Sequence, residues 1–144
     1  MKHVEIDKNI ALSIVIVHDS TDDHFFIKEA LTDFKNLSFS DYYDGEAFLN
    51  FLEEKIKAPL PESGFPDIVI LDINMPKLTG FQVYELVKSK ALKQRIKFYI
   101  LTTSLTATDQ DKCRELCLRC YQKPFNIDHF THLLEDMIHD YTKE

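Results

Sequence analysis

The sequence predicts a doubly wound α/β fold, in which five β-α repeats form a five-stranded parallel sheet with helices on both faces. Three observations predict it. Short continuous apolar runs alternate along the chain with longer segments whose apolar residues recur at helical spacing. The main runs do not alternate with polar residues, which is typical of strands buried on both faces. The chain has 144 residues, the length of one ordinary domain.

Five segments are predicted to be strands. Three are rich in Val, Ile and other apolar residues and are expected in the middle of the sheet. The segment LSFSDY alternates polar and apolar residues and is expected nearer an edge, and the last strand is very short. In chain order the predicted strands are Leu12–Val17, Leu37–Tyr42, Ile68–Leu71, Lys97–Leu101 and Cys120–Gln122.

Five amphipathic segments are predicted to be the helices that cover this sheet. The last stripe is the clearest, and Asn126 stands where its N-cap is expected. The third helix follows the turn Lys77–Gly80, and the proline-rich segment Ala58–Pro66 is predicted to be a long loop. In chain order the stripes run over Phe26–Phe34, Ala47–Ile56, Phe81–Leu92, Thr108–Leu118 and Ile127–Tyr141.

The charge balance excludes one large class of function. Lys and Arg total 17 and Asp and Glu total 24, so the formal net charge is −7. A nucleic-acid surface needs a clustered basic excess, so no nucleic-acid partner is expected. The apolar runs are far shorter than the roughly 20 residues of a membrane helix, and the first residues lack the apolar core of a signal peptide. We therefore expect a cytoplasmic protein with no membrane partner.

Three cysteines lie close together at Cys113, Cys117 and Cys120. An odd number in a chain of this kind does not indicate a disulfide framework. A zinc site would need a fourth ligand, and no nearby histidine supplies one. We expect the cysteines to be small buried residues on a helix face.

Polar side chains follow four of the predicted strands. His18 and Asp19 follow the first strand, Asp72 the third, Thr102 the fourth and Lys123 the fifth. Ligands of open α/β sheets bind beyond the carboxyl ends of the strands, so these groups are expected to converge at one edge. Two carboxylates together suit Mg²⁺, and one of them can be a nucleophile toward a phosphoryl group. A hydroxyl and an ammonium group would balance the charge of the phosphoryl oxygens.

Four of these residues carry a resemblance to a known family. Pro66–Pro76, followed by Thr79-Gly80, resembles the phosphoacceptor segment of two-component response-regulator receiver domains. The triplet Lys123-Pro124-Phe125 is similar to the lysine motif of the same family. Thr102 stands at the position of the family's conserved hydroxyl, and Asp19 at that of a metal-binding acid.

The resemblance extends over nearly the whole chain, from Leu12 to Tyr141. It implies the flavodoxin-like, CheY-like version of the predicted fold. Residues 11–144 would form the receiver domain, and residues 1–10 an N-terminal extension. No output domain is expected after Tyr141, which implies a stand-alone response regulator rather than an enzyme.

The resemblance also implies roles for the site residues. Asp72 would accept a phosphoryl group from a sensor histidine kinase or a histidine phosphotransfer protein. Asp19, Asp72 and the backbone carbonyl of Asn74 would bind Mg²⁺ as the cofactor. Thr102 and Lys123 would contact the phosphoryl oxygens. The conformational change that follows phosphorylation would pass to an unknown downstream protein. If the chain dimerises, the homodimer is expected to form through the fourth helix, fifth strand and fifth helix.

Further family features fall on the neighbouring positions. Asn74 and Ser104 stand where receivers tune the lifetime of the phosphoryl group. The Lys123–Pro124 peptide bond is usually cis in the family, so a cis bond is expected at Pro124.

The sequence departs from the family pattern at two places. Receivers typically carry two adjacent acids after the first strand, and here the first of them is His18. In the family that acid reaches the metal mainly through water, so His18 is expected to act on the metal indirectly and to weaken its binding. The aromatic switch position is also displaced: Cys120 stands three residues before Lys123, and Tyr121 two before it. Strand alternation places these two side chains on opposite faces, and either can be the switch residue that acts with Thr102.

Three other functions remain as alternatives. A receiver-like interaction module that is not phosphorylated is compatible with His18 and the altered switch. An aspartyl-phosphate phosphohydrolase normally has an Asp acid/base two residues after its nucleophile, where this chain has Asn74. A flavodoxin-like cofactor binder would need a glycine in the turn after the first strand, and that turn has none.

Overall fold

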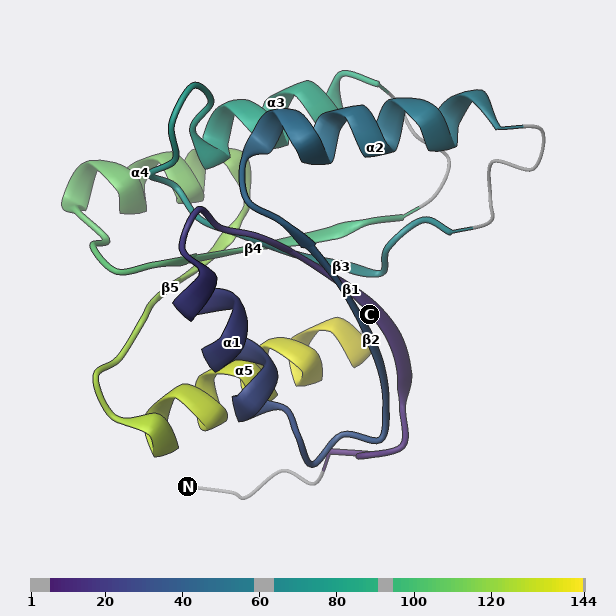
Figure 1. Ribbon diagram of the computed structural model, residues 1–144. Helices are drawn as coiled ribbons and strands as arrows, with labels where there is room; N and C mark the ends of the chain where they lie inside the picture. Colours follow the sequence, from purple (N-terminus) through teal and green to yellow (C-terminus); the bar gives the residue numbers. More distant parts are fainter. Residues whose placement is uncertain (1–5, 59–63, 91–94, 144) are drawn as a thin grey trace.

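A computed structural model describes residues 6–58, 64–90 and 95–143, which form a five-stranded parallel sheet between two layers of helices (Figure 1). The predicted fold class and all five predicted strands are confirmed, with differences of one residue at some ends. The strands are β1 (Ala11–Val17), β2 (Asn36–Tyr42), β3 (Ile68–Leu71), β4 (Lys97–Thr102) and β5 (Arg119–Gln122).

The strand order is β2-β1-β3-β4-β5, so the sheet has β2 and β5 at its edges. The edge position of β2 confirms the interpretation of its alternating sequence, because its residues alternate between exposed and half-buried along most of its length. By contrast, all four residues of β3 are buried, as expected for the central strand. This order puts the carboxyl ends of β1, β3 and β4 side by side.

The five predicted helices are present, and all but the first begin at a polar side chain that accepts a backbone hydrogen bond. Thr79 and Thr106 each form a capping box, and Asn126 accepts hydrogen bonds from the backbone N–H groups of Asp128 and His129, as its predicted N-cap role requires. The helices are α1 (Thr21–Ala30), α2 (Gly45–Lys57), α3 (Gly80–Lys88), α4 (Ala107–Leu116) and α5 (Ile127–Thr142).

Three predicted helix ends differ from the structure. The first stripe was expected to reach Phe34, but α1 ends at Ala30, and Phe34 is buried in the core beyond the helix end. The fourth helix was expected to reach Leu118, but α4 ends at Leu116 because Cys117 adopts a left-handed conformation with φ of 58°. The third was expected to reach Leu92, which lies outside the described residues, and α3 ends at Lys88. In the predicted loop Ala58–Pro66, the described residues 58 and 64–66 belong to no helix or strand, and residues 59–63 lie outside the described residues.

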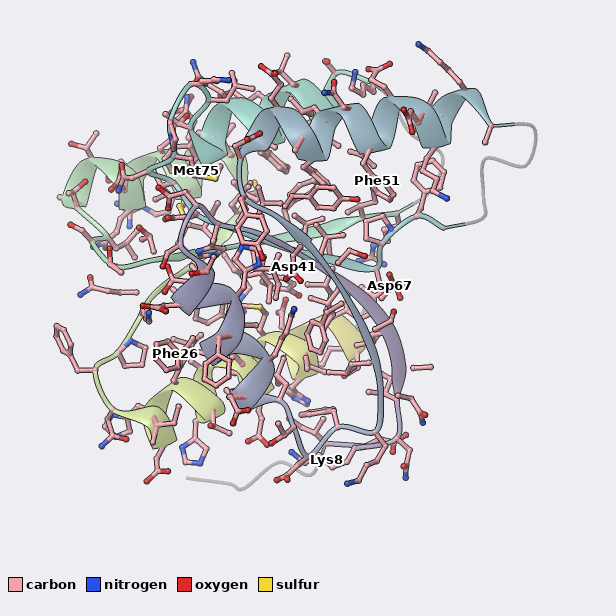
Figure 2. All side chains as sticks on the ribbon, in the orientation of Figure 1. Lys8, Phe26, Asp41, Phe51, Asp67 and Met75 are labelled. Carbon is pink, nitrogen blue, oxygen red and sulfur yellow. A yellow bond between two sulfur atoms is a disulfide. The ribbon has the colours of Figure 1, made fainter. Side chains whose placement is uncertain are left out.

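The sheet separates two apolar cores (Figures 1 and 2). Helices α1 and α5 cover one face, where Ile27 and Leu134 pack on Ile16 and Ile70. Helices α2, α3 and α4 cover the other face, and Phe48 is fully buried there. None of the described helices combines the length and the apolar character needed to cross a membrane.

The expectation that the cysteines are buried on a helix face holds for Cys113 alone, because Cys117 is exposed and Cys120 lies half-buried on β5. Cys113 on α4 is buried as expected, with 3% of its surface exposed, but it forms a disulfide with Cys120 on β5. The two Cα atoms are 6.5 Å apart, within the usual range for a bridge. Spacing along the chain does not show this pairing, since it depends on how α4 packs over the edge strand. Cys117 is free and exposed.

The disulfide is expected to stabilise the folded domain by about 2 to 3 kcal/mol, because it closes a short loop in the unfolded chain. Cys113→Ser should lower the free energy of unfolding by that amount when urea unfolding is measured without reductant. The matched control is Cys117→Ser, which removes an exposed thiol and should have little effect. With dithiothreitol, wild type and Cys113→Ser should become equal. Equal stabilities without reductant would contradict the bridge.

Candidate functional site

Four of the predicted site residues lie at the carboxyl edge of the sheet. His18 follows β1, Asp72 follows β3, Thr102 ends β4 and Lys123 follows β5. The backbone N–H of Asp72 donates to the carbonyl of Val17 at 3.0 Å, and that of Lys123 donates to the carbonyl of Thr102 at 2.7 Å. These bonds extend the parallel ladder past the strand ends and hold neighbouring site residues in place.

Asp72 presents a largely buried carboxylate. Only 14% of its side chain is exposed, and its Oδ1 atom has no hydrogen-bond partner. Burial raises the pKa of Asp72, while His18 and then the Thr102 hydroxyl act in the opposite direction. An under-solvated carboxylate with a free oxygen is what a nucleophile or a metal ligand requires.

The start of α3 fixes the backbone of Asp72. The N–H of Gly80 donates to the carbonyl of Ile73 at 2.9 Å. A Cβ atom at Gly80 would stand 2.2 Å from the carbonyl oxygen of Asp72, so only glycine allows this approach. Lys77, in the preceding turn, has φ of 70°, which folds the chain back toward the sheet. The predicted turn before the third helix therefore positions the acceptor.

His18 is 2% exposed, and neither ring nitrogen has a hydrogen-bond partner. Its Nδ1 atom lies 4.0 Å from Asp72 Oδ2 and 3.8 Å from Asp23 Oδ2, too far for hydrogen bonds. The imidazole therefore stands between two carboxylates without binding either.

His24, which was not among the predicted site residues, holds the backbone of this turn. Its Nε2 atom lies 2.8 Å from the carbonyl oxygen of His18, and its Nδ1 atom lies 2.7 Å from Asp41 Oδ1. Asp41, labelled in Figure 2, also accepts from Lys28 at 2.6 Å. Its burial could have been predicted from the sequence, because His24 precedes Ile27 by three residues and so lies on the buried stripe of α1.

Lys123 forms an ion pair with Asp23 on α1. Its Nζ atom also lies 5.2 Å from the centroid of the Phe26 ring, which Figure 2 labels. Nothing in the sequence distinguishes Asp23 from its neighbour Asp22, because both belong to the acidic first turn of α1. The two residues joined by this ion pair are 100 positions apart.

Asp23 is strongly stabilised in its charged form. Nearby His18, and then Lys123, lower the pKa of Asp23 from 3.8 to about 2, although burial alone would raise it. A pKa that is lower in the folded state stabilises the fold above pH 3.8. That contribution is lost as the pH falls from 3.8 toward 2.

Asp23→Asn is therefore expected to lower the free energy of unfolding at pH 7 by about 1 kcal/mol, after allowance for solvent screening. The difference from wild type should shrink toward zero near pH 2, and urea unfolding at several pH values measures it. Asp22→Asn is the matched control, since it removes the same charge from the same helical turn without touching Lys123. Equal losses in both variants would mean that the helix dipole, and not Lys123, is responsible.

The remaining predicted metal ligands lie toward solvent. Asp19 and Asn74 are both exposed, next to buried His18 and Ile73 respectively. Within residues 6–58, 64–90 and 95–143, no three His, Cys, Asp or Glu side chains already stand together as a metal site. Mg²⁺ usually keeps several waters and takes only one or two carboxylates from the protein. The unpartnered Oδ1 of Asp72 fits a cation held in that way.

The predicted alternation of the two switch candidates is confirmed. Cys120 packs into the core under α2, α3 and α4, and Tyr121 packs toward α1 and α5. Thr102, which is 2% exposed and has no partner for its hydroxyl, follows Leu101 of the α1–α5 core. By strand alternation Thr102 therefore shares the face of Cys120 and not that of Tyr121.

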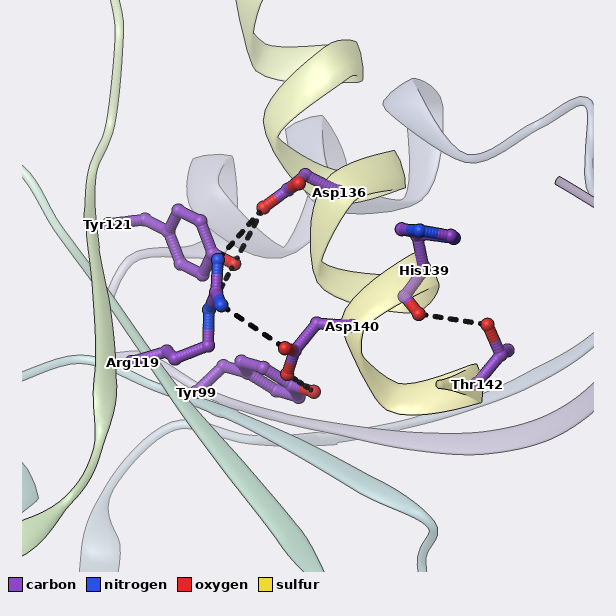
Figure 3. Close-up of polar contacts among 7 residues, drawn as sticks. All are labelled: Tyr99, Arg119, Tyr121, Asp136, His139, Asp140 and Thr142. Carbon is purple, nitrogen blue, oxygen red and sulfur yellow. Dashed lines mark hydrogen bonds and ion pairs between the residues drawn. The ribbon is translucent and has the colours of Figure 1, made fainter. Parts of the chain in front are cut away.

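Tyr121 is instead bound to α5 (Figure 3). Its hydroxyl donates to Asp136 at 3.0 Å and accepts from Arg119 Nε at 3.2 Å. Arg119 also contacts Asp140, which accepts from Tyr99 at 2.7 Å. Burial raises the pKa of Tyr121 to about 12, so its hydroxyl stays protonated as a donor.

The expectation of a cis bond at Pro124 is wrong. Among the described residues no peptide bond is cis, so Lys123–Pro124 is trans, the form that a peptide bond before proline intrinsically favours. The Lys123 side chain reaches Asp23 in this conformation, and Phe125 projects fully into solvent. An open cavity of about 300 Å³ lies here, lined by Phe26, Ile127 and the segment around Lys123.

The sequence profile of the response regulator receiver domain matches residues 14–135. Response regulator Rcp1 of Synechocystis sp. (strain ATCC 27184 / PCC 6803 / Kazusa) is 31% identical over 109 residues, which cover 75% of this chain and 73% of that protein.

Solved structures share the architecture. A crystal structure of the phosphorylated cyanobacterial phytochrome response regulator RcpA has a TM-score of 0.77 and 24% identity, covering 92% of this chain and 95% of that one. The Mn²⁺-bound form of Rcp1 has a TM-score of 0.72 and 27% identity, covering 88% and 91%. At 24% identity, the likeness to RcpA shows that the two proteins share a fold and shows nothing further.

Proposed function

Because this chain belongs to the response regulator receiver domain family, we propose that Asp72 accepts a phosphoryl group in two-component signalling. The observation that carries the proposal is the buried Asp72 carboxylate at the sheet edge, which has a free Oδ1 atom and lies within the influence of the Thr102 hydroxyl. The donor would be a sensor histidine kinase or a histidine phosphotransfer protein. The exchange is proposed to take place in the cytoplasm, as expected from the sequence.

The transfer requires no enzyme beyond the two partners. An oxygen of Asp72 would attack the phosphorus of the donor's phosphohistidine, forming an O–P bond while the P–N bond breaks. The electron pair of that bond would return to the imidazole of the donor. The product is an acyl phosphate on Asp72, with new negative charge that the site must balance.

Asp19, Asp72 and the backbone carbonyl of Asn74 would hold Mg²⁺ at this edge. The cation supplies charge neutralisation for the carboxylates and the phosphoryl oxygens when it is bound. The unpartnered oxygen of Asp72 supports this assignment, and the Mn²⁺-bound form of the relative Rcp1 is a precedent for a divalent ion in such a protein.

Lys123 would bind the phosphoryl oxygens only after a change of partner. In the structure it pairs with Asp23, so phosphorylation would draw Lys123 from Asp23 toward Asp72. Thr102 would move toward the new charge at the same time, because its buried hydroxyl has no partner to lose. Asn74 and Ser104, both exposed, would then tune how readily water reaches the phosphoryl group.

The movement would pass to the surface of α4, β5 and α5. We infer that Cys120 is the switch residue on β5, because it shares the sheet face of Thr102. Tyr121 is held on the other face by Asp136 and would report less directly on Thr102. The signal would be a bias on an equilibrium between two conformations, read by a downstream protein or by a second copy of the chain.

Incubation with acetyl phosphate and Mg²⁺ tests the proposal by intact mass. Wild type is expected to gain one phosphoryl group, roughly 80 Da, and to gain none when EDTA removes the cation. A chain that gains no mass at any pH or Mg²⁺ concentration would instead be an interaction module. The Lys123–Asp23 pair and the replacement of an acid by His18 are the observations that favour this second function.

A further inference from the structure

We propose that His18 is a nitrogen ligand of the cation site, so that this site prefers a first-row transition-metal dication to Mg²⁺. The proposal rests on the proposed function only in assuming that a divalent cation binds beside Asp72. It assigns His18 a direct role, in place of the indirect one expected from its position in the sequence.

The state of the His18 imidazole points to a missing ligand. His18 is 98% buried, and both of its nitrogens lack a hydrogen-bond partner. A buried polar group without a partner is unfavourable, and native proteins rarely tolerate it without a reason. A bound cation would supply the missing partner for one of these nitrogens.

The position of the Nδ1 nitrogen suits a cation shared with Asp72. Nδ1 faces Asp72 Oδ2 at 4.0 Å and Asp23 Oδ2 at 3.8 Å. Two ligands that each lie about 2.1 Å from one ion are separated by roughly 3 to 4 Å. The gap between His18 and Asp72 is therefore at the upper end of the separation that a shared cation produces, and a small side-chain rotation would close it.

The backbone of His18 is fixed on both sides. Its N–H donates to the carbonyl of Tyr42 at 3.2 Å, and its carbonyl oxygen lies 2.8 Å from His24 Nε2. His24 is in turn anchored by Asp41 on β2. The His18 ring is thus held on a rigid turn, and its Nδ1 atom already faces the cation site before a metal binds.

The ligand types decide the choice of metal. Mg²⁺ takes oxygen ligands and binds imidazole poorly, whereas Fe²⁺, Co²⁺, Ni²⁺ and Zn²⁺ accept imidazole nitrogen readily. Asp23 is engaged by Lys123, which leaves Asp72 as the carboxylate that faces His18. Asp19, the exposed residue that follows His18 in the chain, would supply a second carboxylate. One nitrogen and two carboxylates form a mixed set that suits the transition metals better than Mg²⁺.

Titrations with Co²⁺ and with Mg²⁺, without any phosphoryl donor, test this inference. Calorimetry gives both dissociation constants, and the visible absorption of bound Co²⁺ reports on its ligands. The preference for Co²⁺ over Mg²⁺ is expected to fall at least about tenfold in His18→Asp, with a change in the Co²⁺ spectrum. His132→Gln, which removes an exposed imidazole from α5, is the matched control and should behave as wild type.

His18→Gln provides a second variant if His18→Asp does not fold, since it removes the nitrogen without adding a charge. Equal Co²⁺ preference and equal spectra in wild type and in the folded His18 variants would overturn the inference. The proposed function fails separately, if wild type binds Co²⁺ through His18 but no metal supports phosphorylation by acetyl phosphate.

Discussion

Replacing Asp72 by asparagine is expected to abolish phosphoryl uptake and, at the same time, to stabilise the folded domain. The amide cannot form an acyl phosphate, so intact mass should show no gain after incubation with acetyl phosphate and Mg²⁺. The stability gain follows from burial, which raises the pKa of Asp72 and so makes its charged form unfavourable in the folded state. Removing a largely buried charge with a free oxygen should stabilise by about 1 kcal/mol or more.

The direction of the pH dependence shows whether the stability gain comes from removing the buried Asp72 charge or from a general effect of the substitution. A carboxyl group whose pKa is raised on folding lowers stability above that pKa, and the penalty disappears as the pH falls through it. The advantage of Asp72→Asn in urea unfolding should therefore be largest at neutral pH and shrink in acid. EDTA must be present, because a bound cation would offset the charge in wild type. Asp22→Asn should still take up the phosphoryl group, and mass gain in Asp72→Asn would place the acceptor elsewhere.

Gly80→Ala is expected to destabilise the domain by about 2 to 3 kcal/mol and to slow phosphorylation. The new Cβ would stand 2.2 Å from the carbonyl oxygen of Asp72 and 3.2 Å from the Cα of Ile73. These are backbone atoms, so no side-chain rotation relieves the clash and the start of α3 must move. The acceptor segment moves with it, because the N–H of Gly80 is bonded to the carbonyl of Ile73.

Gly45→Ala is the matched control for this substitution. Gly45 also begins a helix, α2, but there the nearest atom to a new Cβ is a methyl carbon of Val83 at 2.4 Å. A side chain can move aside more readily than a backbone, so we expect a smaller loss of stability and normal phosphorylation. Equal losses in the two variants would show that the Asp72 backbone is not the cause.

Much of the fold could be predicted because the strands carry their own signal. β1, β3 and β4 are buried on both faces, so their sequences are short apolar runs that no other element of this chain resembles. Once the repeats are parallel, the carboxyl ends of the strands must meet at one edge. This rule was enough to predict that Asp72, Thr102 and Lys123 lie at the same edge of the sheet, without any knowledge of their contacts.

Contacts between distant segments could not be predicted. The bridge between Cys113 and Cys120 depends on the height at which α4 crosses β5, and spacing along the chain does not record this. The ion pair between Lys123 and Asp23 needs the fifth strand and the first helix to be neighbours around the site. Either Asp22 or Asp23 could have served, since only the rotation of α1 distinguishes them.

The sequence by itself therefore determined the order of the elements, the edge at which the site lies, and the opposite orientations of Cys120 and Tyr121. These follow from periodicity, which is a local property of the chain. Only the tertiary structure decided that the ring of His18 turns inward unpartnered, that Lys123 rests on Asp23, and that Cys120 faces the side of Thr102. Such features depend on how helices pack on the two faces of the sheet, because burial and pairing are set by residues far apart in the chain.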